Sequence, residues 1–422
     1  MATSTSLAAT VCIVGGGPAG IMVGLLLARA GIEVVVLEKH HGFLHDFRDD
    51  TVHPSTLGVL AEIGLAERVL ALPHRKAHTV GLVRGGASVD IADFRTLGLR
   101  HPYIAFVAQW DLLDVLSTEA QRYPNFRLLM GSQVHGLVRE SGRIVGVRYR
   151  DPDGEHEIRS HLTVAADGRH STVRRAAGLR PREFGAPLDV VMFRVSRRHT
   201  DPDEVYRIHM TRRRSVVVID RTTHWNIAYP IRKDGHDQFR RRGIEALRND
   251  VAGLVPFVAD RVDELAGFDD IRILQVRVDR VSRWHLPGLL LIGDAAHAMS
   301  PMGGIGINLA VQDAVAAANI LAAHLMRTQR YGTHVPESAT AAVQRRRQPP
   351  TATTQALQRF AQIFGIERAL RGGVTLDCGP LLKNRLVQTM VSRLIGVGVR
   401  PEHVRTPHVA AAREDARVAV RC

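Results

Sequence analysis

A glycine-rich turn between two apolar segments is the first feature whose residue types and spacing could do chemistry. The turn reads Gly15-Gly16-Gly17-Pro18-Ala19-Gly20. Gly15 lets the chain leave a strand sharply, Gly17 leaves room for a pyrophosphate, and Gly20 allows helix and strand to pack closely. The N–H groups and the positive dipole end of the following helix would face the phosphates. The turn therefore predicts a site for an adenine dinucleotide, and by itself it leaves NAD and FAD open.

An acidic residue after the next strand supports the same interpretation. Glu38 follows the mostly apolar segment Ile32–Leu37, about twenty residues beyond the glycine turn. At that spacing its carboxylate is expected to accept hydrogen bonds from a ribose hydroxyl.

The stretch Gly293–Asn308 is the second one with chemical potential. Asp294 follows an apolar strand expected at Leu289–Ile292, so its carboxylate should emerge at a sheet edge and suit a ribityl or ribose hydroxyl. The glycines after it let backbone N–H groups and a helix N-terminus approach a ligand closely. A reduced flavin carries negative charge near N1 and O2, which such amide dipoles stabilise. A flavin needs such an arrangement, and two such loops in one dinucleotide fold argue against an ordinary glycine-rich strand-to-helix loop.

A third motif, Asp167-Gly168, ends an apolar strand expected at His161–Ala166, and Ser171 beyond it is a candidate N-cap. In their order the three motifs resemble those of the class A flavoprotein monooxygenases, the para-hydroxybenzoate hydroxylase-like family. The resemblance covers residues 11–325. It implies one FAD held across two lobes.

The fold class implied by the resemblance is α/β. A Rossmann-like FAD-binding domain of the GR2 type would be interleaved with a β-sheet substrate domain, followed by a helical C-terminal region. The FAD-binding domain is expected at residues 1–75, 100–180 and 281–327, the substrate domain at 76–99 and 181–280, and the C-terminal region at 328–422.

Local patterns agree with this division. Alternating apolar residues predict a hairpin within 75–96 and a mostly β segment over 189–231, whereas 308–325 reads as a long helix. The C-terminal region is predicted to be helical, with breaks at Pro349-Pro350, Gly372-Gly373 and Pro380.

The resemblance also implies which residues bind FAD. They are Gly15, Gly17, Pro18, Ala19, Gly20, Glu38, Lys39, Arg48, Gln109, Val134, Asp167, Gly168, Gly293, Asp294, Pro301, Gly303, Gly304, Gly306, Ile307 and Asn308. Arg48 and Gln109 would contact the pyrophosphate, and Pro301 would lie beside the reactive edge of the flavin. The Asp167-Gly168 segment would also serve the transient visit of NADPH or NADH. Arg169 next to it is either a phosphate contact or a solvent-facing arginine.

The implied reaction needs no side-chain nucleophile. Reduced nicotinamide would reduce the flavin, O2 would add to form a C4a-hydroperoxide, and an electron-rich aromatic ring would attack its distal oxygen. The substrate would be a phenolic or polyketide-like small molecule. His53 is either a base that makes a phenolate or an ordinary loop histidine. The candidate substrate contacts are Met192, Arg194, His209, Trp225 and Tyr229, of which Trp225 and Tyr229 could instead fill the core.

Three rival functions remain open. A flavin-dependent halogenase shares the implied fold, and Lys76 lies in roughly the region of the halogenase lysine, but the W-x-W-x-I-P pattern is absent. A reductase or dehydrogenase could use the same FAD without inserting oxygen. A non-catalytic basic binding protein is the most remote alternative.

Composition limits the partners. The 422 residues carry a net charge of +14, with arginine clusters at 212–214, 240–242 and 345–347, yet aromatic residues make up 5% and do not interleave with them. We therefore expect a solvated basic surface and no nucleic-acid partner. Cys12, Cys378 and Cys422 lie far apart, so we expect no metal site and a cytoplasmic location. No apolar run suggests a stable membrane span, and a homodimer is left open.

Overall fold

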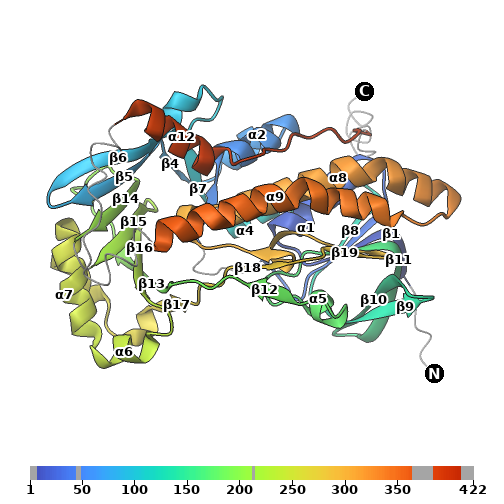
Figure 1. Cartoon of the computed structure of the whole chain (residues 1–422), viewed down its shortest axis with the longest axis horizontal. Coiled ribbons are helices and arrows are strands. Elements are labelled where there is room, and N and C mark those ends of the chain that lie inside the picture. Colours follow the sequence, from blue (N-terminus) through green and yellow to red (C-terminus); the bar gives the residue numbers. More distant parts are fainter. Residues whose placement is uncertain (1–6, 44–48, 212–213, 364–383, 410–422) are drawn as a thin grey trace, which may run out of the picture.

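The computed structural model describes residues 7–43, 49–211, 214–363 and 384–409. Its architecture is the expected α/β fold, with a mainly parallel sheet at one end, a second sheet at the other, and two long helices running along both (Figure 1). The proposed domain boundaries stay predictions.

The larger sheet holds the nucleotide-type unit predicted from the glycine turn. Its strands are β1 (Leu7–Val14), β2 (Val34–Leu37), β8 (Phe126–Leu129), β9 (Gln133–Glu140), β10 (Arg143–Asp151), β11 (Gly154–Ala165), β19 (His285–Leu286) and β20 (Leu289–Leu291). The path β20-β11-β1-β2-β8 is parallel throughout, and β19, β10 and β9 add antiparallel edges. The carboxyl ends of β1, β11 and β20 therefore meet at one edge, where ligands bind in such sheets.

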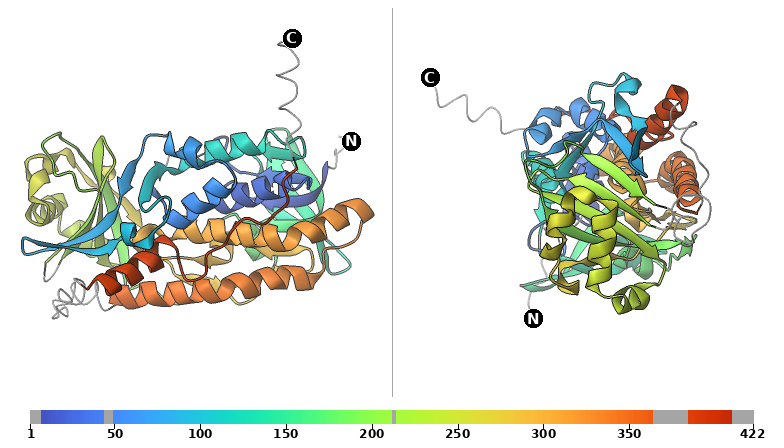
Figure 2. Two further views of the ribbon diagram at one scale, coloured as in Figure 1. Left: turned by 90° about the horizontal axis from the view of Figure 1, so that it is seen from above. Right: turned by 90° about the vertical axis from the view of Figure 1, so that its left-hand side faces the viewer.

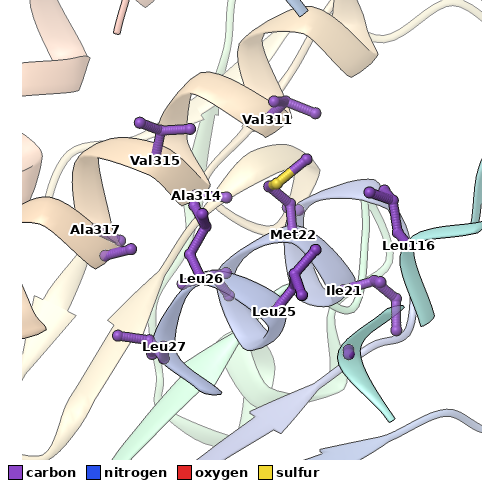
Figure 3. Close-up of a cluster of buried hydrophobic side chains, with 14 of the residues drawn as sticks. Ile21, Met22, Leu25, Leu26, Leu27, Leu116, Val311, Ala314, Val315 and Ala317 are labelled. Carbon is purple, nitrogen blue, oxygen red and sulfur yellow. The ribbon is translucent and has the colours of Figure 1, made fainter. Parts of the chain in front are cut away.

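The helices around this sheet are α1 (Pro18–Arg29), α2 (Pro54–Glu62), α3 (Ala66–Leu70), α4 (Gln109–Ala120), α5 (Thr172–Ala176) and α8 (Gly306–Tyr331). Helix α1 is buried between α8 and α4, and its apolar side chains leave no polar face. Figure 3 shows Met22 and Leu26 of α1 against Val311 and Ala314 of α8, with Leu116 of α4 on the far side. This packing fixes the N-termini of α1 and α8 relative to the sheet edge.

The second sheet has the order β17-β13-β16-β15-β14-β5-β6. Its strands are β17 (Arg272–Leu274), β13 (Leu188–Ser196), β16 (His224–Arg232), β15 (Ser215–Asp220), β14 (Tyr206–Met210), β5 (Thr79–Arg84) and β6 (Ala87–Asp93). All pairs are antiparallel except β14 with β5. One face packs on α7 (Ile244–Leu254), next to α6 (His236–Arg241), and the other face turns toward the first lobe.

Two small sheets connect the lobes. One has the order β3 (Asp49–Val52), β7 (Ile104–Ala108) and β4 (Arg75–Ala77), and the other has β12 (Pro181–Glu183), β18 (Asp279–Val281) and β21 (His297–Ala298). Seen from above, α9 (Glu337–Ala361) lies alongside α8 (Figure 2). Helix α12 (Arg385–Gly396) lies beyond the end of α9 and packs against β6.

The predicted helix break at Pro349-Pro350 is wrong, because α9 continues through both prolines. Proline removes a helical N–H and crowds the preceding turn, but side chains on both sides of the pair tie the helix to one surface. Gln344 bonds to Ser282 O and Trp284 N before the prolines, and Gln355 bonds to backbone carbonyls after them. The breaks predicted at Gly372-Gly373 and Pro380 lie outside the described residues.

One helical segment, Met302–Tyr331, is long and apolar enough to cross a membrane by length and composition alone. In the structure 72% of its most apolar window is buried inside the protein. Because α1 and α9 cover it, its apolar character is accounted for by core packing.

Candidate functional site

The three motifs meet at the carboxyl edge of the larger sheet. A Cβ atom on Gly15 would lie 2.4 Å from Ala166 O and 2.9 Å from the Cα of Asp167. A Cβ on Gly293 would lie 3.1 Å from the Cβ of Ala19. The sequence separates these turns by more than a hundred residues, and the fold places them in van der Waals contact.

The backbone of the first turn needs glycine for two different reasons. Gly15 has φ +107°, which side chains disfavour, and a Cβ on Gly20 would lie 1.9 Å from Gly15 O. Gly17 differs, because its φ is −75° and a Cβ there would meet no atom of the described residues within 4 Å. Space is thus left open at Gly17, the position at which a pyrophosphate is predicted.

Helices α1 and α8 present free N-termini at this edge. Neither has a side-chain cap or an acidic residue in its first turn, and Pro18 occupies the first turn of α1. A Cβ on Gly306, the first residue of α8, would likewise meet no atom within 4 Å in the described part of the chain. Two positive dipole ends and open space suit an anionic, extended ligand.

Glu38 closes the first turn from the side. Its carboxylate accepts hydrogen bonds from Gly16 N (2.8 Å) and His40 N (3.0 Å), which fixes it against the turn. Lys39 is exposed, and Val134 is buried in β9. The predicted ribose contact of Glu38 stays a prediction, and Arg48 lies outside the described residues.

Asp167 caps α5 with one of its oxygens. Oδ2 accepts from Thr172 N (2.8 Å) and Val173 N (3.1 Å), while Oδ1 is buried without a hydrogen-bond partner among the described residues. Burial raises the pKa of Asp167 above its ordinary value despite these bonds. Ser171 also caps α5 as predicted, since its hydroxyl accepts from Arg174 N at 2.9 Å. An unpartnered buried oxygen beside Gly168 is a place for a ligand donor.

Asp294 emerges half-buried from the third motif, as the strand-end position predicts. Arg169 Nη2 lies 3.6 Å from its carboxylate, so Arg169 is neither free in solvent nor isolated from the site. The buried Arg174 donates to Ala295 O (2.9 Å) and Arg169 O (2.6 Å) and thereby ties the second and third motifs together.

The turn before α8, at Gly303 and Gly304, packs against Thr51 of β3. Gly303 and Gly304 have φ +76° and +64°, and a Cβ on Gly304 would lie 2.1 Å from Thr51 Oγ1. The Thr51 hydroxyl donates to Gly304 O at 2.6 Å. Pro301, predicted to border the flavin, is exposed at the start of this turn.

His53 is fully buried behind the same turn. Its Nδ1 lies 2.8 Å from Ile395 O in α12, and its Nε2 lies 3.1 Å from Gly304 O and 3.3 Å from Thr51 Oγ1. Burial lowers the pKa of His53 to about 4, although these backbone carbonyls favour the protonated ring. Since both ring nitrogens face protein groups, the geometry favours a positioning role over that of a general base.

Asn308 lies in the first turn of α8 with its amide only half satisfied. Its Oδ1 accepts from Ser55 Oγ (2.7 Å) and Thr56 Oγ1 (2.6 Å), whereas Nδ2 is buried without a partner in the described part of the chain. Ile307 packs on the core beside it, and Gln109 begins α4. The free amide hydrogens point to an acceptor that the protein does not supply.

The substrate candidates divide between the two faces of the second sheet. Trp225 and Tyr229 lie on the face that α7 covers, and they fill the core there. Trp225 donates to Asp201 (2.7 Å), and Tyr229 donates to Asp250 of α7 (2.8 Å). His209 lies on the same side, 6.3 Å from the Phe257 ring. These placements support packing roles for the three side chains.

Met192 and Arg194 occupy the opposite face, which turns toward the first lobe. Their strand register places Asn226 directly across from Arg194 on that face. Asn226, which we did not single out from the sequence, is 3% exposed, and its Oδ1 has no partner among the described residues. The sequence signal is that Asn226 is a polar residue within the mostly apolar strand β16.

This face is connected to the turn at Gly304. Phe106 pairs with Thr51 in the β3–β7 ladder, and its ring lies 5.7 Å from that of Tyr206 on β14. Tyr206 is on the sheet face of Asn226, so the apolar face and the glycine turns belong to one neighbourhood.

A group of buried ionic residues is not predicted from the sequence. Arg347 was expected on a solvated basic surface, but it is fully buried and pairs with Asp313 of α8, so that expectation is wrong for Arg347. The sequence does contain one indication, because Asp313 is an acidic residue within the mostly apolar segment that forms α8. Within the described ranges no three His, Cys, Asp or Glu side chains gather in a way that could hold a metal ion.

Together these features fit an FAD. One edge of the sheet carries the open positions at Gly17 and Gly306 and the N-termini of α1 and α8. It also carries the polar atoms of Asp167 and Asn308 that lack a partner among the described residues. A flavin dinucleotide offers a pyrophosphate, hydroxyl groups and ring acceptors to such groups.

Comparison with known proteins gives a consistent result. A family model described as FAD binding domain matches residues 8–353. The 6-methylpretetramide 4-monooxygenase of Streptomyces rimosus is 31% identical over 362 residues, which cover 82% of this chain and 82% of that protein. The para-nitrophenol 4-monooxygenase of Pseudomonas sp. (strain WBC-3) is 28% identical over 330 residues, covering 74% and 77%.

The fold also has solved counterparts. The flavin-dependent brominase Bmp2 has a TM-score of 0.73 and 16% sequence identity, with 92% of this chain and 93% of that chain covered. At that identity the likeness shows the fold alone.

Proposed function

Since the chain belongs to the FAD-binding monooxygenase family, we propose that it uses NADH or NADPH and O2 to hydroxylate a small aromatic molecule, phenolic or polyketide-like. The observation that carries the proposal is the meeting of the three motifs at one sheet edge. An apolar sheet face with an unsatisfied amide is linked to that edge through the contact between Phe106 and Tyr206. Two relatives named for the 4-monooxygenation of 6-methylpretetramide and of para-nitrophenol support the substrate class.

When bound, FAD supplies the redox chemistry and the activation of O2. The N-terminus of α1 and the open position at Gly17 would bind the pyrophosphate, and Asp294 would accept hydrogen bonds from the ribityl chain. The N-terminus of α8 would place amide dipoles where the reduced ring becomes negative. Thr51 and His53 hold Gly304 in the conformation that this requires.

The substrate would lie against the sheet face that carries Met192, Arg194 and Asn226. Apolar neighbours on that face exclude water, and Asn226 Oδ1 is an acceptor in need of a donor, such as a phenolic hydroxyl. Neither His209 nor Tyr229 contributes to this face, because both side chains pack toward α7.

The reductant would approach through the cationic surface next to Asp167-Gly168. Burial, together with the charges of Arg277, Arg169, Arg174 and Arg175, lowers the pKa of His170. These arginines create a positive potential that would attract the pyrophosphate of NADH or NADPH. A cytoplasmic location, a homodimer and the absence of a nucleic-acid partner remain predictions.

The rival reactions are less well supported. Lys76, the candidate halogenase lysine, is exposed, and its ammonium lies 4.9 Å from the Tyr103 ring centre on the outer side of β4. A dehydrogenase would use the same FAD contacts, and a purely basic binding protein would have no need of them.

The test is product analysis with the FAD-loaded protein. We expect NADH or NADPH oxidation to accelerate with the right phenolic compound, and mass spectrometry to show a product heavier by one oxygen. A product that carries halide, or a substrate that has lost only hydrogen, would reassign the reaction to a halogenase or a dehydrogenase.

A matched pair of variants tests the cofactor site. Gly17→Val adds a side chain whose Cβ meets no atom of the described residues within 4 Å, so we expect the protein to fold normally and lose FAD. Gly267→Val in the second lobe, where a Cβ also meets no described atom within 4 Å, should keep wild-type flavin content. Asp294→Ala should also impair FAD retention, and wild-type flavin content in Gly17→Val and Asp294→Ala would contradict the assignment.

A further inference from the structure

A fully buried carboxylate, that of Asp313, is hydrogen-bonded to the Gly293–Asp294 turn. Asp313, in the third turn of α8, accepts hydrogen bonds from Gly293 N (3.1 Å), His297 Nε2 (2.6 Å) and Arg347 Nε (3.1 Å). Gly293 has φ +58° and begins the turn that carries Asp294. One side chain therefore holds the backbone of a predicted flavin-binding turn.

The same carboxylate reaches the C-terminal part of the chain through Arg347. The Arg347 guanidinium, on α9, also donates to Arg400 O (2.9 Å), to Glu402 Oε1 (3.1 Å) and to Gln312 Oε1 (3.2 Å). Arg347 and Asp313 are both fully buried, and Glu402 is nearly so. The chain of contacts runs from Gly293 through α8 and α9 to the segment at residues 400–402.

The charges are balanced only while the whole group is assembled. Burial alone would raise the pKa of Asp313, but His297 and Arg347 outweigh it and hold the pKa below its ordinary value. An unpaired charge in this environment is strongly unfavourable, so Asp313 and Arg347 each require the other. Two carboxylate oxygens serve three donors, and an amide in their place would turn N–H groups toward at least one of them.

We propose that Asp313 is a positioning residue that couples the attachment of the C-terminal segment at Arg400–Glu402 to FAD binding at the Gly293–Asp294 turn. This inference rests on the proposed function in taking that turn as a flavin contact. Because coupling between two sites is reciprocal, FAD binding should tighten the C-terminal segment by the same factor by which the segment tightens FAD binding.

The binding test compares three variants with a matched control. Asp313→Asn, Arg347→Met and Glu402→Gln each interrupt the group at a different point. Arg261→Met is the control, because Arg261 is also buried and pairs with Asp201 in the second lobe, away from the glycine turns. FAD affinity is measured by fluorescence titration of apoprotein, and unfolding temperature is measured on the same samples.

We expect Asp313→Asn and Arg347→Met to weaken FAD binding by about tenfold or more, and Glu402→Gln to weaken it less. Asp313→Asn should also shift the visible spectrum of the bound flavin. Arg261→Met should lower the unfolding temperature without changing FAD affinity or the spectrum. Equal affinities in Asp313→Asn and Arg261→Met at a temperature where both are folded would overturn the proposal.

The reciprocal test uses hydrogen exchange of the peptide that spans Arg400–Glu402. In wild-type and Arg261→Met protein, added FAD should slow exchange in that peptide, and in Glu402→Gln, which leaves Asp313 with its three partners, the slowing should be lost. FAD-independent exchange in wild type would overturn the coupling even if binding is tight. If wild-type protein does not bind FAD at all, the proposed function fails instead, which separates the two outcomes.

Discussion

The imidazole of His53 gives the structure a measurable pH response. Burial lowers its pKa to about 4 in the folded protein, whereas a histidine in an unfolded chain titrates near its ordinary value of about 6.5. Between these values the unfolded chain binds a proton that the folded protein does not bind. The folded state therefore becomes less stable as pH falls from about 6.5 to about 4, and the effect levels off below that range.

The size of the effect follows from the same two pKa values. Each pH unit between them is worth about 1.4 kcal/mol, so His53 should remove about 3 kcal/mol from the free energy of unfolding as the pH falls from 7 to 4. That is a large share of the stability of an ordinary protein. Burial also lowers the pKa of His224 to about 4, so the contribution of His53 has to be isolated by substitution.

The direct assay is nuclear magnetic resonance titration of histidine rings in protein labelled at those rings. The His53 signal is assigned by its absence in His53→Gln, and His199→Gln, which removes an exposed histidine, is the control. We expect the His53 signal to remain unprotonated down to about pH 5. We also expect the unfolding free energy of His53→Gln to fall less steeply with acidification than that of wild type and His199→Gln. A His53 signal that titrates near 6.5, or identical pH slopes in all three proteins, would refute the reasoning.

Three further substitutions separate packing from binding. Gly20→Ala places a Cβ 1.9 Å from Gly15 O, so we expect both FAD retention and the unfolding temperature to fall. Gly58 lies in the middle of α2, and a Cβ there would meet no described atom within 4 Å. Gly58→Ala should therefore raise the free energy of unfolding by about 0.5–1 kcal/mol, measured in a denaturation series. Tyr229→Phe removes a hydrogen bond to the buried Asp250 and should cost about 1–2 kcal/mol of stability while KM stays within about twofold; a large rise in KM would return Tyr229 to the substrate site.

The sequence predicts the parts of the site whose requirements are local. Gly15 is needed because its φ is +107°, and Gly20 is needed because a Cβ there would lie 1.9 Å from Gly15 O, so both requirements can be stated within one strand–turn–helix unit. The N-cap at Ser171 follows from the same kind of local rule. Such features are predictable because the cause and the residue lie in the same short segment.

The features that the sequence does not predict depend on distant partners. The ionic partner of Arg347 lies 34 positions earlier on another helix, and within its own cluster of three arginines nothing marks it as the buried one. The helix through Pro349-Pro350 persists because contacts on both sides of the prolines outweigh the local penalty. The face on which Trp225 lies also depends on register, because α7 covers only one side of the sheet.

A division of labour in the site explains both results. The predicted ligand contacts at Gly17, Gly304 and Gly306 are made by backbone, and backbone has no side chain with which to fix its own geometry. That geometry is held by buried polar groups behind the turns, Asp313 under Gly293 and the Thr51–His53 pair under Gly304. Substitutions in these supporting groups should therefore change flavin affinity without adding or removing a ligand contact, whereas substitutions at the glycines should act by direct obstruction. FAD binding by variants of both kinds distinguishes these two modes: obstruction at Gly17 should leave stability intact, and loss of Asp313 should not.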